Sequence, residues 1–183
     1  MQVAANYIDQ ILIFSVFAVS LNVLLGYAGQ VSVAHASFGA IGGYAAGYLS
    51  LTHGLNLPIS ILIGALVAGV VGAIVALPAL RLSEEYLILL TLGVSSVVLG
   101  LFATFSQLGG TYGLIGIPPA SIFGYELTDP IDWVLPLAVV LVVIYSICHR
   151  MGESAYGRVL KGIREDADAT LSLGKNVIVY KVV

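Results

Sequence analysis

The stretch LPISILIGALVAGVVGAIVALPAL, Leu57–Leu80, decides the fold class of this chain. It contains no charged side chain, and it is longer than the roughly 20 residues that an α-helix needs to cross the hydrocarbon core of a bilayer. A helix that is apolar on all sides either lies inside a large core or spans a membrane. In a chain of 183 residues the stretch therefore predicts a membrane-spanning helix.

The composition of the whole chain agrees with this prediction. Apolar residues make up 59% of the chain and charged residues 9%, whereas soluble domains have about 25% charged residues. We therefore predict an all-α fold, a polytopic transmembrane helical bundle with about five spans and the start of a sixth. The predicted spans are Tyr7–Leu25, Val31–Leu51, Leu57–Leu80, Tyr86–Phe105 and Ile131–His149, and Val177–Val183 begins the sixth.

The placement of basic residues predicts the orientation of the bundle. Five of the seven Lys and Arg residues lie between Arg150 and Lys175, and short loops rich in Lys and Arg stay in the cytoplasm. The polar segment 150–176 is therefore predicted to be cytoplasmic, and Ser106–Pro130, which has no basic residue, to be outside. The side of the N-terminus depends on whether Val31–Leu51 crosses fully or is broken. Acidic residues interleaved with the basic ones argue against a nucleic-acid surface.

Small residues recur at intervals of four within two of the predicted spans. Such rows let membrane helices approach each other closely. The predicted helix-packing residues are Gly39, Gly43, Gly47, Ala65, Gly69 and Ala73.

The chain shows no pattern typical of an enzyme. It has no phosphate-binding loop and no HExxH motif, paired acids or Ser–His constellation within the spans. Cys148 is its one cysteine, so no thiolate metal site can form. We predict no catalytic residue, cofactor or metal, and a chain that is not an enzyme.

Four collinear stretches resemble the permease subunits of branched-chain amino-acid ABC transporters, and within them the LivM-like subunits. The first and longest is LNVLLGYAGQVSVAHASFGAIGGY at Leu21–Tyr44. The others are LPALRL at Leu77–Leu82 with the following Tyr86-Leu87 and Thr91–Gly93; GGTYGL at Gly109–Leu114 with Ile117-Pro118; and Gly157-Arg158, IRE at Ile163–Glu165, Leu173-Gly174 and Tyr180-Lys181.

The resemblance implies a function and a set of partners. It implies a permease subunit that moves Leu, Ile and Val across the inner membrane by alternating access, as a multi-pass protein in the bilayer. It implies a second permease subunit, two ABC ATPase subunits that hydrolyse the ATP, and an extracytoplasmic substrate-binding protein, with no nucleic acid. Residues 1–183 would form a single transmembrane permease domain. Because family members usually continue with further helices, that domain is expected to be incomplete.

The resemblance and the residues together suggest two sites. A His inside an apolar segment is a functional hypothesis by default in membrane proteins, and broken helices can present free N–H groups to a carboxylate. The candidate substrate-pathway residues are Asn22, Gln30, Ser32, His35 and Ser37. Within segment 150–176, an apolar stripe of Val159, Ile163 and Ala167 at helical spacing suits a groove of an ATPase. The candidate ATPase-coupling residues are Gly157, Arg158, Ile163, Arg164, Glu165, Leu173 and Gly174.

Other functions stay open at this point. A secondary transporter or channel would use similar small-residue helices without docking an ATPase. A permease remnant without function is a second alternative. Related permeases also carry urea, other amides, other amino acids or sugars, so the assignment of branched-chain substrates rests on analogy.

Overall fold

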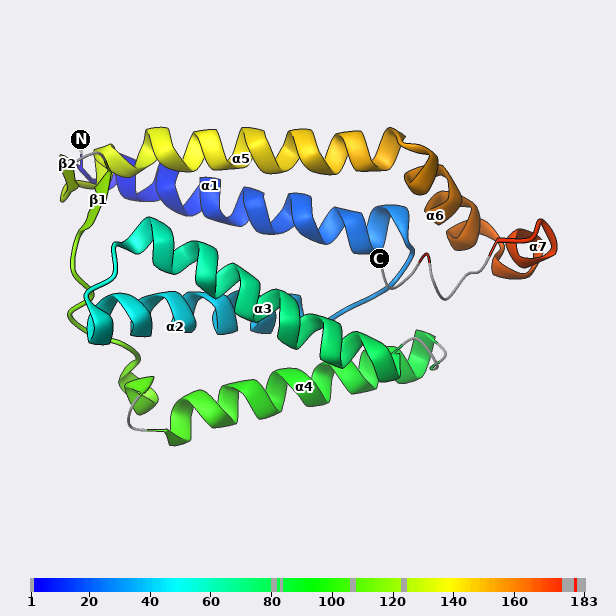
Figure 1. The fold of residues 1–183 in the computed structure, drawn as a ribbon, viewed down its shortest axis with the longest axis horizontal. Helices are drawn as coiled ribbons and strands as arrows, with labels where there is room; N and C mark the ends of the chain where they lie inside the picture. The colour runs from blue at the N-terminus through cyan, green and yellow to red at the C-terminus, as the bar shows by residue number, and fades with distance from the viewer. Residues whose placement is uncertain are drawn as a thin grey trace. The chain divides into compact units, whose positions relative to one another are not determined.

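The computed structural model describes residues 2–79, 82, 84–105, 108–122, 125–175 and 180 (Figure 1). Nearly all regular structure in these residues is helical, which confirms the prediction of an all-α helical bundle. The chain divides into two compact units, and each is described by itself. The first contains Met1–Ser32 and Asp129–Val183, and the second contains Val33–Thr128. The predicted single permease domain stays a prediction.

The first unit is built on a pair of long helices. Helix α1 (Gln2–Asn22) continues directly into a single π-helical turn, η1 (Val23–Tyr27). Helix α5 (Pro130–Glu153) lies beside α1 along its length (Figure 1). At Ser154 the chain turns into α6 (Ala155–Glu165), which is followed by the short α7 (Ala167–Ser172). The residues of α1 and α5 are a mixture of exposed and half-buried ones with hardly any buried, as expected for helices that span a membrane.

The second unit contains α2 (His35–His53), α3 (Leu57–Ala79) and α4 (Glu84–Thr104). Beyond α4 lie a 3₁₀ turn, η3 (Gly110–Tyr112), and a hairpin of β1 (Ala120–Ile122) and β2 (Tyr125–Leu127). The strands are antiparallel, with Ala120 opposite Leu127. The side-chain amide of Asn56 fixes β1, because its Nδ2 donates to the Ser121 carbonyl at 2.7 Å and its Oδ1 accepts from the Ser121 N–H at 3.3 Å.

Helices α2 and α3 approach most closely at a pair of glycines. A Cβ placed on Gly64 would lie 2.3 Å from the Gly42 carbonyl oxygen, and one placed on Gly42 would lie 3.2 Å from the Gly64 carbonyl oxygen. The methyl groups of Ala46 and Ala68 flank this contact. Glycine at both positions therefore permits a backbone-to-backbone contact of the kind that membrane helices use.

Four helices of the described residues are long and apolar enough to cross a membrane: Val3–Tyr27, Leu57–Ala79, Glu85–Thr104 and Pro130–Glu153. They match four of the five predicted spans. Most of the remaining predicted span, Val31–Leu51, lies within α2, which begins at His35 and is not among these four helices, so a full crossing there stays a prediction. Its many Gly, Ser and Tyr residues lower its hydropathy. Arg81 and almost all of the predicted sixth block lie outside the described residues.

Candidate functional site

The break that follows α1 leaves backbone groups without their usual helical partners. In the π-turn the Ala28 N–H donates to the Val23 carbonyl at 3.3 Å, and the Gln30 N–H then reaches back to the Leu24 carbonyl at 3.0 Å. In an α-helix the Gln30 N–H would instead bond to the Gly26 carbonyl. Gly29 ends the turn with a positive φ of 68°, which glycine adopts at little cost. The Gly26 carbonyl therefore needs another donor.

Arg164 of α6 supplies that donor. Its Nη1 donates to the Gly26 carbonyl at 2.5 Å, although the two residues are 138 positions apart in the chain. The aliphatic part of the same side chain lies over Gly29, where an added Cβ would be 2.8 Å from the Arg164 Cγ. The GYAGQ stretch and the IRE stretch, which carry the resemblance separately, thus meet in one contact.

A second contact joins α6 to the same break. The Lys161 Nζ lies 5.2 Å from the centroid of the Tyr27 ring, within the range of a cation–π interaction. The Tyr27 ring packs on the backbone of Gly152, where an added Cβ would lie 2.3 Å from its Cζ. Lys161 also forms an ion pair with Glu153 at 3.1 Å, and both side chains are well exposed, so the pair contributes little stability.

The polar segment beyond α5 forms two short helices, α6 and α7, and not one helix. Asp166 separates α6 from α7, and its carboxylate caps α7 by accepting from the Ala169 N–H at 2.9 Å. Ser154 caps α6 by accepting from the Gly157 N–H at 3.2 Å. Gly157 is buried against the end of α5, where a Cβ would meet the carbonyls of Met151 and Gly152. Asn176, the last residue of the predicted coupling segment, lies outside the described residues.

The apolar stripe predicted for this segment is only partly available to a partner. Ile163 is 4% exposed, so its side chain belongs to the packing of the first unit. Nothing is described for the Ala167 side chain, and Val159 is half-buried.

Tyr156 lies at the start of the same helix. Burial raises the pKa of its hydroxyl, with a smaller contribution from Tyr180, whose carbonyl accepts from that hydroxyl at 2.6 Å.

Other side chains of the segment face outward. Leu171 is 59% exposed and Leu173 is 80% exposed, while Arg158, Glu165 and Gly174 are also exposed. Arg158 donates to the Glu153 carbonyl at 2.9 Å. A groove of about 270 Å³ between α6 and α7 is lined by residues that include Arg158, Leu173 and Lys175. The outward surface therefore combines exposed leucines with positive charge.

The predicted substrate-pathway residues fall in both units. Asn22, Gln30 and Ser32 belong to the first unit, and His35 and Ser37 lie in the first turn of α2 in the second unit. Asn22 borders a cavity of about 360 Å³ whose lining also includes Tyr27, Tyr145 and His149. Ser37 is buried, whereas Gln30, Ser32 and His35 are half-buried. Their role in transport stays a prediction.

The sequence did not predict that two hydroxyl groups of α4, those of Thr91 and Ser95, bond to the backbone that leads into α2. The Thr91 hydroxyl accepts from the Val33 N–H at 3.2 Å, and the Ser95 hydroxyl donates to the Val33 carbonyl at 3.4 Å. The Thr91 hydroxyl donates its own proton to the Ile88 carbonyl at 3.0 Å, and the single proton of the Ser95 hydroxyl is shared between the Val33 carbonyl and the Thr91 carbonyl, which lies closer, at 3.0 Å. Non-helical backbone at membrane depth needs such partners, so α4 stabilises the segment that leads into α2.

The predicted packing rows lie beside the observed helix contact. A Cβ added to Gly43 or Gly69 would meet no atom within 4 Å, while one on Gly47 would lie 3.1 Å from Ile117 Cδ1. Gly39, Ala65 and Ala73 lie within α2 and α3. The packing role of these six residues stays a prediction.

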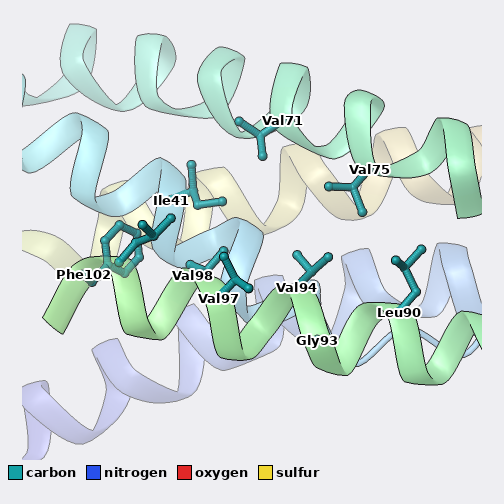
Figure 2. A pocket seen from close by; sticks show the side chains of 10 residues that line it. Ile41, Val71, Val75, Leu90, Gly93, Val94, Val97, Val98 and Phe102 are labelled. Atoms are coloured by element: carbon teal, nitrogen blue, oxygen red, sulfur yellow. The ribbon is translucent and has the colours of Figure 1, made fainter. Parts of the chain in front are cut away.

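A cavity between helices of the second unit is apolar. It measures about 660 Å³, and Figure 2 shows Val71 and Val75 of α3 directed toward Leu90 and Val94 of α4. Phe102 at its edge stacks on Tyr44, with ring centroids 4.0 Å apart. The side chains that line this cavity offer no charge to the carboxylate or amine of an amino acid.

Comparison with known proteins decides the family. Residues 3–183 match the family described as the branched-chain amino acid transport system / permease component. The chain belongs to this permease family. It is therefore a multi-pass membrane protein of a transport family, which agrees with its four apolar helices.

Curated relatives of this permease share its sequence along most of its length. It is 30% identical to the high-affinity branched-chain amino acid transport system permease protein LivM of Escherichia coli (strain K12), over 89% of this chain. It is 28% identical over 69% of its length to a probable LivM permease of Methanocaldococcus jannaschii. The chain spans 44% of the length of the first relative and 36% of the second. No solved structure matches it significantly.

Proposed function

We propose that this chain is a permease subunit of an ATP-binding-cassette importer that moves Leu, Ile and Val across the inner membrane by alternating access. The family match over residues 3–183 supports a transport role, and the names of the curated relatives support branched-chain amino acids as substrates. Urea, other amides and other amino acids are the alternative substrates. The proposed partners are a second permease, two ATPase subunits and an extracytoplasmic binding protein.

One structural observation carries the ATPase part of this proposal. The two short helices α6 and α7 follow directly after α5, and Leu171 and Leu173 are exposed there next to charged residues. Exposed apolar residues with a polar rim mark protein–protein interaction sites. The segment is also the most basic part of the chain, and so it is proposed to face the cytoplasm, where ATPases bind nucleotide.

The proposed docking surface differs in detail from the stripe that periodicity suggests. Ile163 and Arg164 contact the chain's own first unit, so substitution there would disturb the permease itself. Leu171, Leu173, Arg158 and Glu165 are exposed and carry the docking surface in this proposal. Gly157 permits the close packing of α6 on the end of α5, and Gly174, with a φ of 76°, turns the chain after α7.

Copurification with the ATPases tests the proposal. Replacing Leu171 and Leu173 together by Ser should reduce the copurified ATPase at least about tenfold, because exposed apolar anchors dominate such interfaces. Replacing Tyr112, which is 88% exposed in the loop beyond α4, by Ser is the matched control and should change nothing. Equal copurification by all variants would contradict docking at α6–α7. No copurification by the unsubstituted chain would contradict the importer.

A further inference from the structure

The Arg164 side chain connects two parts of the chain that lie far apart in the sequence, α6 and the break that follows α1. Its guanidinium bonds to the Gly26 carbonyl at 2.5 Å, and its methylene groups lie on Gly29. We propose that Arg164 is a positioning residue whose side chain holds the break at the end of α1 against α6, so that α6 and residues 23–30 move together. We call this contact the lock. The geometry of both partners supports this assignment.

The backbone of the break offers a hydrogen-bond acceptor to a donor from another helix. Its Gly26 carbonyl has lost the N–H that an α-helix would supply, because Gln30 bonds to Leu24 instead. A carbonyl that the helix leaves unpaired bonds to a side chain, to water or to a ligand. A guanidinium is a suitable replacement donor, since it is always charged and carries five N–H groups in a rigid plane. Bonds from charged donors are also about twice as strong as neutral ones.

The absence of a side chain at Gly29 makes room for Arg164. A Cβ at that position would lie 2.8 Å from Cγ and 3.3 Å from Cβ of Arg164. The contact therefore depends on the glycine as well as on the arginine. One turn earlier in α6, Lys161 lies over the ring of Tyr27 and adds a second contact to the same segment.

Arg158 provides an internal contrast on the same helix. Its Nη1 donates to the Glu153 carbonyl at 2.9 Å, at the corner between α5 and α6, and so it bonds within the polar segment. Both arginines belong to stretches that resemble the permease family, but of the two hydrogen bonds described, the one made by Arg164 reaches η1 and the one made by Arg158 does not. The hydrogen bond to the Gly26 carbonyl is thus specific to position 164 and is not made by Arg158.

The lock has a consequence that rests on the proposed function. If an ATPase binds α6 and α7, a displacement of these helices passes through Arg164 to the break between α1 and α2. That break holds Gln30 and Ser32, two of the candidate substrate-pathway residues. A movement caused by the ATPases would then reach these candidate residues through the contacts that Arg164 and Lys161 make with the break.

The rate of thiol modification tests the lock without any ATPase. Cys148 is first replaced by Ala, and Ala28, which is 8% exposed within the break, is replaced by Cys as the reporter. The purified chain in lipid nanodiscs is treated with N-ethylmaleimide. Arg164→Leu should raise the reaction rate of the reporter about tenfold, because loss of a charged hydrogen bond promotes local opening. Arg164→Lys should restore most of the protection, and Arg158→Leu should leave the rate unchanged.

A second reporter separates local release from general unfolding. Ala5→Cys places a thiol at the opposite end of α1, where the native residue is 4% exposed, and its rate should not change in any variant. The proposal is overturned if Arg164→Leu leaves the Ala28→Cys rate unchanged, if Arg158→Leu raises it equally, or if the Ala5→Cys rate rises with it. Failure of the ATPase to copurify would contradict the proposed function alone and would leave this result standing.

Discussion

Gly64 determines how closely α2 and α3 approach, because its backbone faces the Gly42 carbonyl where a Cβ would lie at 2.3 Å. Gly64→Ala should therefore separate the helices and destabilise the second unit by about 1–3 kcal/mol, the usual cost of overpacking. Gly69→Ala is the matched control on the same helix, because a Cβ there meets no atom within 4 Å. Thermal unfolding in detergent should show a lower Tm for Gly64→Ala alone. Equal Tm values for both variants would contradict the close approach.

At this scale the sequence predicts the kind of contact but not its residues. Rows of small residues at intervals of four indicate helix packing, yet α2 has glycine at adjacent positions, Gly42 and Gly43, and so contains neighbouring rows of this kind. Which row faces α3 depends on the rotation of the helix, and that is set by its neighbours. The bond from Arg164 to Gly26 cannot be predicted from the sequence either, because no local pattern links residues 138 positions apart.

The segment that leads into α2 is the element on which the described fold depends most clearly, since its backbone is not helical. Thr91 and Ser95 of α4 bond to the N–H and carbonyl of Val33. Thr91→Val combined with Ser95→Ala should destabilise this segment by about 0.5–1.5 kcal/mol for each hydrogen bond lost, the usual net contribution of such a bond. Ser96→Ala is the control, because its hydroxyl bonds only to the Leu92 carbonyl of its own helix among the described contacts.

Hydrogen exchange at Val33 measures this effect. Its amide should exchange faster in the Thr91 and Ser95 double variant and at the normal rate in Ser96→Ala. Equally slow exchange in both would show that α4 does not hold the segment.

Element boundaries followed from the sequence where hydropathy alone decides them. Leu57–Leu80 contains no charged residue and has Ser60 as its one polar side chain, and α3 spans Leu57–Ala79 of it. Val31–Leu51 contains enough glycine and polar residues that its hydropathy is ambiguous, and its helix starts four residues later, at His35. The division of segment 150–176 at Asp166 depends on one capping carboxylate, which the charge pattern did not single out.

At the scale of the whole molecule the composition was decisive. A chain with 9% charged residues cannot cover a water-facing surface, and four of its helices are long and apolar enough to span a bilayer. The four collinear motifs predicted the family, which the match over residues 3–183 confirms. Substrate, energy source and partners cannot be read from packing, because they depend on surfaces that meet other molecules.

Uptake of labelled leucine into proteoliposomes tests the central claim most directly. The chain is reconstituted with its companion permease, ATPases and binding protein, with ATP supplied on the side of the ATPases. We predict that leucine uptake requires ATP. Unlabelled isoleucine and valine should compete with labelled leucine, whereas urea should not. The variant in which Leu171 and Leu173 are both replaced by Ser should lose uptake. Uptake driven by an ion gradient in the absence of ATP, or no uptake above that of empty liposomes, would contradict the account.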